Sequence, residues 1–301
     1  MDIFSFNGRD NPACSVGNQP GVRPLGQTTA GTDTPGQTHR PRQRSLLIRL
    51  IIIPLAVFFA WMLEIYFLAG IPRLFSRNNP IGLLLYSVFS CCVLGIIVPM
   101  TCIRSSFLSG AVNMFQIGFR SPRRTISACA ITALVGYACV VLFSPFGADR
   151  LAFANAFLIF LPTSIAAVMV CWVLIGTHVQ AFVRTGGMLV SILTGVMVTA
   201  FLFSFSLLVL IPAAGPDSVI VLLFCIGCGA AIFFFAVRDV YPTILVVTFV
   251  MVFVWASSLD PLYLHAPGPV VYAAAIIPAG VLAGIHGYFS RHYTTIPVKA
   301  P

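Results

Sequence analysis

Glu64 is the residue of this sequence best placed to do chemistry, since it is the only glutamate and lies deep within an apolar run. An ionised carboxylate in hydrocarbon costs about 2.5–3.5 kcal/mol or more, so it needs a partner or a function. Burial favours the protonated form, which suits coupling to a proton or cation. The structural alternative is a hydrogen bond or ion pair with Arg73, Arg77, Arg150 or Asn155. Because Asn155 is expected near the same depth, Glu64 and Asn155 are the candidate substrate- or ion-coupling residues.

Two histidines from different apolar runs offer a second chemistry. His178 ends the fourth run, and His286 lies inside the eighth by about one turn. Two imidazoles at similar depth can ligate a b-type haem, although headgroups can equally solvate histidines at a membrane interface. A membrane-embedded enzyme or haem-type electron carrier that uses His178 and His286 is therefore the alternative function.

The cysteines and the sequence motifs predict no further site. Cys225 and Cys228 form a CxxC pair in mid-run, where no cation or helix N-terminus would stabilise a thiolate, so packing explains them better than redox chemistry. There is no Walker loop, HExxH or GxSxG motif. No catalytic residue, metal site or cofactor is predicted, and a non-enzymatic protein is favoured over an enzyme.

The composition predicts the environment in which these residues act. Of the 301 residues, 58% are hydrophobic and 8% are charged, with a mean hydropathy of +0.98. A soluble protein carries about 25% charged residues, because a fold in water needs a polar surface. The sequence therefore predicts an all-α membrane protein.

Apolar runs long enough to cross a bilayer follow one another along the chain. A crossing helix needs about 20 residues. The expected spans are 48–71, 81–103, 125–144, 151–176, 188–211, 218–237, 242–259 and 269–289. The expected fold is thus a polytopic bundle of about eight transmembrane helices over residues 46–290. A polar, disordered tail (1–45) precedes it and a short tail (291–301) follows it.

Basic residues predict the orientation of this bundle, because Arg and Lys gather on the cytoplasmic side. With the N-terminus in the cytoplasm, that side holds Arg40, Arg42, Arg44, Arg49, Arg104, Arg120, Arg123, Arg124, Arg184, Arg238, Arg291 and Lys299, and the outside holds only Arg73, Arg77 and Arg150. The sequence therefore predicts a multi-pass protein of the cell membrane with both termini cytoplasmic. Its expected partners are the bilayer, anionic headgroups at the cytoplasmic face and a membrane protein, but not nucleic acid.

Three local patterns predict contacts. Residues 104–124 place Leu108, Val112, Phe115 and Phe119 on one helical face, which predicts an amphipathic interfacial helix that ends at Pro122. The Arg238-Asp239 pair predicts a local ion pair. Small residues predict close helix contacts, and they are Gly280 with Gly284, Ser191 with Gly195, and Gly227 with Ala231.

The function that fits these features best is a permease-like transporter of a small or apolar molecule, or a membrane subunit of a complex. In the transporter interpretation, Glu64 and Asn155 line a cavity in the outer half of the bilayer. The helices kinked by Pro54, Pro99, Pro162 and Pro278 are the moving parts.

Overall fold

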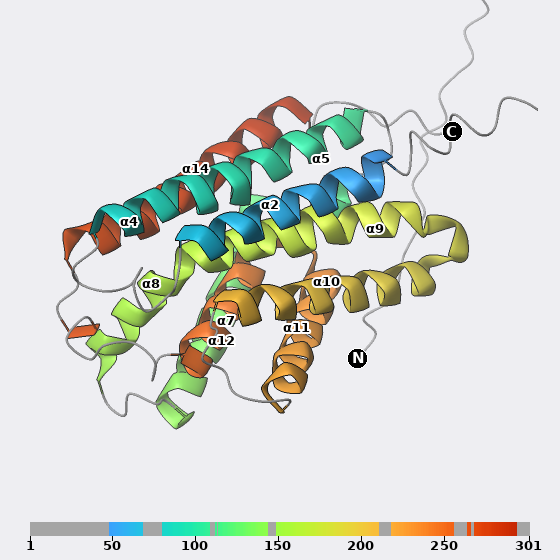
Figure 1. Cartoon of the computed structure of the whole chain (residues 1–301). Coiled ribbons are helices and arrows are strands. Elements are labelled where there is room, and N and C mark those ends of the chain that lie inside the picture. Colours follow the sequence, from blue (N-terminus) through green and yellow to red (C-terminus); the bar gives the residue numbers. More distant parts are fainter. Residues whose placement is uncertain are drawn as a thin grey trace, which may run out of the picture. The chain divides into compact units, whose positions relative to one another are not determined.

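The computed structural model of the protein describes residues 48–68, 80–108, 112, 114–143, 149–210, 218–255, 264–265 and 268–293, whose regular structure is helical throughout (Figure 1). The predicted N-terminal tail and most of the C-terminal tail lie outside these residues. The longer helices are α2 (Ile53–Leu68), α5 (Val98–Leu108), α7 (Pro122–Phe143), α8 (Arg150–Ala167), α10 (Met188–Leu210), α11 (Ser218–Val237), α12 (Val240–Trp255) and α14 (Pro269–Tyr293). Two short helices, α4 (Pro80–Leu85) and α9 (Thr177–Phe182), extend longer ones.

Stretches of wider π-helix continue three of these helices. They are η1 (Ile48–Ile52) before α2, η2 (Tyr86–Ile97) between α4 and α5, and η3 (Val168–Gly176) between α8 and α9. Pro54 and Pro99 each follow such a stretch by two residues. A proline lacks an N–H and clashes with the carbonyl four residues earlier, so the turn before it widens. At the end of η2, the Val98 amide donates to the carbonyl of Val93, five residues earlier.

The described part of every run expected to span the membrane is helical, which confirms the all-α prediction. Six helices are long and apolar enough to cross a membrane, and they are Leu50–Phe67, Ile81–Leu108, Arg150–Phe182, Met188–Val209, Ile220–Val237 and Pro269–His292. The helix over Val240–Val254 is apolar but shorter. The first turn of α7 holds Arg123 and Arg124, which lower its hydropathy. The architecture therefore fits a helical membrane protein, while the number of eight spans stays a prediction.

The continuous helix Arg150–Phe182, formed by α8, η3 and α9, is the centre of the bundle. In its apolar stretch 89% of the residues are buried, against 28–50% in the other five long helices. It packs against α2, η2, α10, α12 and α14. In Figure 1 it runs from the label α8 to the label α9, between α2 and α10. These five elements are positioned against the central helix, whereas α7 packs against α12, and α11 packs against α10 and α12.

Close contacts at small residues hold neighbours near this centre. A Cβ at Gly95 of η2 would meet Ala166 of α8 at 2.5 Å, and one at Gly227 of α11 would meet the Ala200 carbonyl oxygen of α10 at 2.9 Å. The predicted contact at Gly227 is therefore confirmed. Helices in lipid associate through such packing, because lipid tails offer apolar contacts of the same kind.

Of the other two predicted small-residue contacts, one is confirmed and one is wrong. Gly195 is confirmed, because a Cβ there would lie 3.1 Å from the Phe235 ring, and Ser191 donates a hydrogen bond of 3.0 Å to the backbone of α9. The contact at Gly280 and Gly284 is wrong for the described part of the chain, since nothing in it lies within 4 Å of either Cβ position. This face of α14 points away from the bundle.

The predicted amphipathic helix over 104–124 is also wrong. Helix α5 ends at Leu108, which is 65% exposed, whereas Val112 is 3% exposed, so the two do not share one face. A single turn, α6 (Met114–Ile117), is followed by Gly118 with φ +87°. That left-handed conformation suits glycine and ends the turn. Pro122 then begins α7 instead of ending a helix, which is where a missing N–H does least harm.

Candidate functional site

Glu64 lies at the edge of the face that α2 turns toward the bundle. Phe58, Trp61 and Ile65 form the buried centre of this face, and Glu64, three residues after Trp61, is half-buried beside it. The Oε2 atom of Glu64 and the Nε1 atom of Trp61 are both buried, and neither has a hydrogen-bond partner among the described residues. Within the described residues, a carboxylate acceptor and an indole donor therefore lie unpaired on one helix. Arg73 and Arg77, two of the partners expected for Glu64, lie outside those residues.

Ser90 of η2 approaches this carboxylate from the neighbouring helix. Its hydroxyl interacts with Glu64, but the two do not form a hydrogen bond of good geometry, and Oγ of Ser90 stays buried and unpaired in the described structure. Its residue is 0% exposed. The other buried hydroxyls do have partners. Many donate to the carbonyl four residues earlier in their own helix, as do Ser164, Thr177, Thr199, Ser204, Thr243 and Thr248.

A third helix joins the site through Tyr86 and Thr163. Their hydroxyl oxygens are 2.9 Å apart in a buried hydrogen bond between η2 and α8. Glu64 is close enough to act electrostatically on Tyr86 and on the buried thiol Cys91. We call these residues the Glu64 cluster, and they are Trp61, Glu64, Tyr86, Ser90, Cys91 and Thr163.

The chemistry open to the Glu64 cluster follows from its unpaired atoms. A carboxyl group can bind a proton or a cation, and the Ser90 hydroxyl can either donate to it or offer a second oxygen. All three helices hold their own backbone amides in helical hydrogen bonds, so only side chains or a bound species can satisfy the carboxylate. Sequence reasoning found Glu64 but missed Ser90, whose signal was its spacing of four residues from Tyr86.

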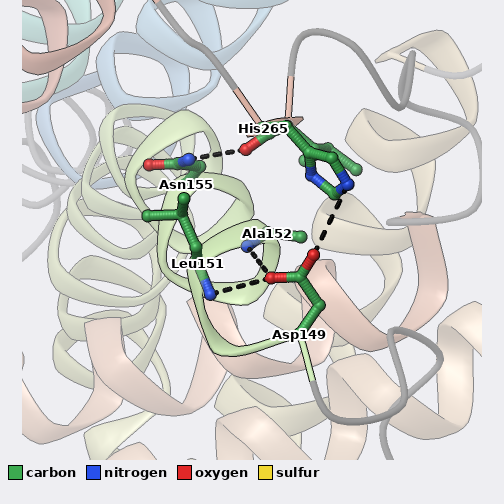
Figure 2. A network of polar contacts seen from close by, with 6 residues as sticks. Asp149, Leu151, Ala152, Asn155 and His265 are labelled. Atoms are coloured by element: carbon green, nitrogen blue, oxygen red, sulfur yellow. Dashed lines mark hydrogen bonds and ion pairs between the residues drawn. The ribbon is translucent and has the colours of Figure 1, made fainter.

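Asn155, the second predicted residue, belongs to a different contact (Figure 2). Its Nδ2 donates to the backbone carbonyl of Leu264, and the Tyr272 hydroxyl lies 3.5 Å from its Oδ1. Thr163 lies eight residues further along the same helix, which is a rise of about 12 Å. No hydrogen bond joins Asn155 to Glu64 in the residues that the structure describes. The structure thus does not bring the predicted pair together.

Asp149 organises the end of the bundle around Asn155. It caps α8 by accepting hydrogen bonds of 3.0 Å from the backbone amides of Leu151 and Ala152. Its other oxygen lies 3.4 Å from Nε2 of His265, as Figure 2 shows. His265 was assigned no role from the sequence. The pair joins the start of α8 to the segment before α14, so its role is to hold two segments together.

His178 and His286 have separate partners. The Nδ1 atom of His178 is 2.7 Å from the carbonyl oxygen of Leu174, which can only accept, so Nδ1 carries the proton. The Nε2 atom is 2.8 Å from the hydroxyl of Ser106 and accepts its hydrogen bond. His286 contacts Tyr241 at 3.0 Å. Both nitrogens of His178 are thus in use, which leaves no lone pair for haem iron.

No metal site appears among the described residues, where no group of three His, Cys, Asp or Glu side chains is placed to hold an ion. The eight cysteines in the described chain are free. Cys91, Cys92 and Cys171 are buried, as packing requires, whereas Cys225 of the CxxC pair is exposed.

Asp239, in the link between α11 and α12, is the centre of a second buried polar group. It is 0% exposed. It accepts hydrogen bonds from the Thr125 hydroxyl at 2.7 Å and from the Tyr241 backbone amide at 3.3 Å. Burial raises the pKa of Asp239 above its ordinary value, and the hydrogen bonds from Thr125 and Tyr241 partly oppose this rise.

Arg238 points away from Asp239, so the predicted ion pair between these neighbours is wrong. Arg238 has φ +53°, and its guanidinium donates to Oε1 of Gln180 at 2.9 Å. Its own carbonyl accepts from Nε of Arg120 at 2.9 Å. Burial, and then repulsion by Arg120, lower the pKa of Arg238 to about 10. We call Arg120, Thr125, Gln180, Arg238, Asp239 and Tyr241 the Asp239 network.

Comparison with family models, curated proteins and solved structures finds no match for this chain. The class that fold and composition support is a helical membrane protein with at least six apolar helices of spanning length among the described residues.

Proposed function

We propose that the protein is a permease-like transporter of a small or apolar molecule, and that Glu64 is its proton- or cation-coupling group. The observation that carries this proposal is a buried carboxylate oxygen of Glu64 that has no hydrogen-bond partner among the described residues, beside the Ser90 hydroxyl, which has none there either. Leaving such groups unsatisfied costs about 1–3 kcal/mol each, or more for a charged one. A proton or cation that enters and leaves would satisfy them for part of a transport cycle.

The surroundings of the cluster support movement. The π-helix η2 holds Ser90, and it ends two residues before Pro99. π-Helical turns and prolines leave backbone carbonyls less firmly bonded, and both are common at functional sites in membrane helices. Five residues after Ser90, Gly95 packs tightly on Ala166 of α8. This contact fixes η2 to α8 at one point, about which the part of η2 that holds Ser90 can move.

The experiment tests Glu64 before any substrate is known. A hydrophobic carbodiimide adds to a protonated carboxylic acid in an apolar site, and the labelled peptide is identified by mass spectrometry. We expect labelling at Glu64 to fall when Na⁺ binds the carboxylate or when a higher pH removes its proton. Glu64→Gln should not be labelled at this position. In proteoliposomes, Glu64→Gln should abolish solute uptake driven by a pH or Na⁺ gradient and leave the fold intact.

Two outcomes would overturn this proposal. One is a Glu64 that reacts at the same rate at every pH and Na⁺ concentration, because its carboxyl would then exchange neither ion. The other is gradient-driven uptake that Glu64→Gln leaves unchanged.

The second candidate, a membrane subunit of a complex, is favoured by the outward face of α14. Gly280 and Gly284 have open space at their Cβ positions, and Ile276 beside them is 66% exposed. Such a face suits close approach of another helix. Gly284→Leu should then reduce the mass of the complex extracted in mild detergent, whereas a transporter acting alone would keep its mass.

A further inference from the structure

A groove between α7, α11 and α12 lies apart from the Glu64 cluster. Its volume is about 570 Å³. Ile131, Val135 and Cys139 line one wall, and Phe233 and Phe253 lie among the aromatic residues opposite. Val135 is 57% exposed and Ile131 is 62% exposed, so the groove is open along α7. Its shape and lining suit a flexible hydrocarbon chain.

Basic residues stand at one end of this groove. Arg124 lies seven residues before Ile131 and eleven before Val135, which are two and three helical turns, so all three share one face of α7. The rise from Arg124 to Ile131 is about 10 Å. Arg124 is exposed and makes no hydrogen bond or ion pair with any residue that the structure describes.

Arg120 adds a second positive charge at the same end. Its Nε donates to the carbonyl of Arg238, which directly follows α11, the helix that contributes Phe233 to the groove. Arg124 repels Arg120, which after burial is the next cause of its lowered pKa. The negative charge of Asp239 acts in the opposite direction and raises the pKa of Arg120. The two Asp239 oxygens accept hydrogen bonds from the Thr125 hydroxyl and the Tyr241 amide. Arg120 and Arg124 therefore place two neighbouring positive charges at the end of α7 from which Ile131, Val135 and Cys139 continue as the lining of the groove.

We propose that this groove binds an anionic phospholipid, with its phosphate at Arg120 and Arg124 and one acyl chain along Ile131, Val135 and Cys139. The occupant follows from the combination of positive charge at one end and hydrocarbon lining beyond it. Within a bilayer the acyl chain gains little by leaving other chains, because both surroundings are apolar. Selectivity therefore comes from the phosphate, and the groove fixes where that phosphate sits. The site does not depend on the function of Glu64.

The test uses the full chain in nanodiscs of equal parts phosphatidylglycerol and phosphatidylcholine, released into native mass spectrometry. Wild type should retain one phosphatidylglycerol in preference to phosphatidylcholine. Arg124→Gln should lower that preference about fivefold, the effect of one basic residue at a membrane surface. Arg123→Gln is the matched control, because it removes the same charge in the same turn about 80° around the helix from Ile131.

A second pair of variants tests the acyl chain. Val135→Trp fills the groove and should reduce retention of the lipid, whereas Leu134→Trp, at a 70% exposed position outside the lining, should not. Soluble glycerol phosphate should not displace the lipid. Equal effects of Arg123→Gln and Arg124→Gln would overturn the proposal, because general surface charge would explain both. So would retention that Val135→Trp leaves unchanged, displacement by glycerol phosphate, or a second copy of the chain in place of the lipid.

Discussion

The Glu64 cluster and the Asp239 network each hold a carboxylate beside a hydroxyl from another helix, but the two carboxylates differ in how completely they are paired. Elsewhere in the Asp239 network, Nε2 of Gln180 is buried and has no partner among the described residues. Both oxygens of Asp239 accept hydrogen bonds, one from Thr125 and one from a backbone amide. In the Glu64 cluster, a carboxylate oxygen, a hydroxyl and an indole N–H have no partner in the described chain. A fully paired polar group stabilises a fold, while a partly paired one weakens it and persists only where something else requires it.

The positions of the two residues in their helices explain this difference. Asp239 stands between α11 and α12, where the first amides of α12 have no helical partner and can donate to it. Glu64 stands inside α2, where every nearby amide is already bonded within the helix. Its carboxylate therefore depends on other side chains or on a bound ion. We infer a structural role for Asp239 and a functional one for Glu64.

The largest expected effect is the loss of stability when the Asp239 carboxylate is removed. Asp239→Ala leaves the Thr125 hydroxyl and the Tyr241 amide without their acceptor, and it should lower the free energy of unfolding by about 2–4 kcal/mol. Thermal unfolding of the detergent-solubilised protein measures it. The control is Asp149→Ala, which removes an exposed helix cap and should cost about 1 kcal/mol. Equal losses of stability in the two variants would contradict the structural role that we infer for Asp239.

Two serines of η2 provide a smaller, sharper comparison. Ser87 donates a hydrogen bond of 2.6 Å to the Ala274 carbonyl, and Ser90 donates to none of the described residues. Ser87→Ala should therefore lose about 1 kcal/mol of stability, while Ser90→Ala should keep or gain stability. Both are followed by the midpoint of thermal unfolding. A Ser90→Ala protein as unstable as Ser87→Ala would show that the Ser90 hydroxyl is paired after all.

The smallest expected effect is a pH dependence at Asp239. Burial raises its pKa in the fold, so the folded state binds the proton more tightly than the unfolded state. Its contribution to stability is therefore greatest below the ordinary pKa of aspartic acid and falls as the pH rises through the raised value. Asp239→Asn keeps an acceptor for Thr125 and should remove this part of the dependence. Wild type and Asp239→Asn with parallel stability curves from acidic to neutral pH would contradict the assignment.

The helical segments were predictable because each is a long apolar run, and lipid requires such a run to bond its backbone internally. Residues 218–237, for example, coincide with α11 as the structure shows it. The π-helical stretches were not predicted, since apolar content does not distinguish i→i+4 from i→i+5 bonding. Pro54 and Pro99 were the available signals.

The site was predictable only in part. Glu64 stood out by its type, but its partners come from other helices and cannot be read from spacing along one. The Asp239 network was misread for the same reason, because Thr125 lies 114 residues from Asp239 in sequence. A sequence neighbour, Arg238, was assigned as the partner instead. Side-chain direction at a residue with φ +53° cannot be inferred from adjacency.

Infrared spectroscopy of the Glu64 carboxyl group tests the central claim most directly. Difference spectra of wild type minus Glu64→Gln isolate this group, which is the chain's only glutamate. We predict a carbonyl band of a protonated acid at low pH that gives way to carboxylate bands when the pH or the Na⁺ concentration rises. In Ser90→Ala, Na⁺ should leave these bands unchanged, because the variant lacks the hydroxyl oxygen that we expect to bind the cation beside the carboxylate. A carboxylate that stays ionised at every pH and ignores Na⁺ would mean a permanent ion pair, and it would contradict the claim that Glu64 is unpaired and exchangeable.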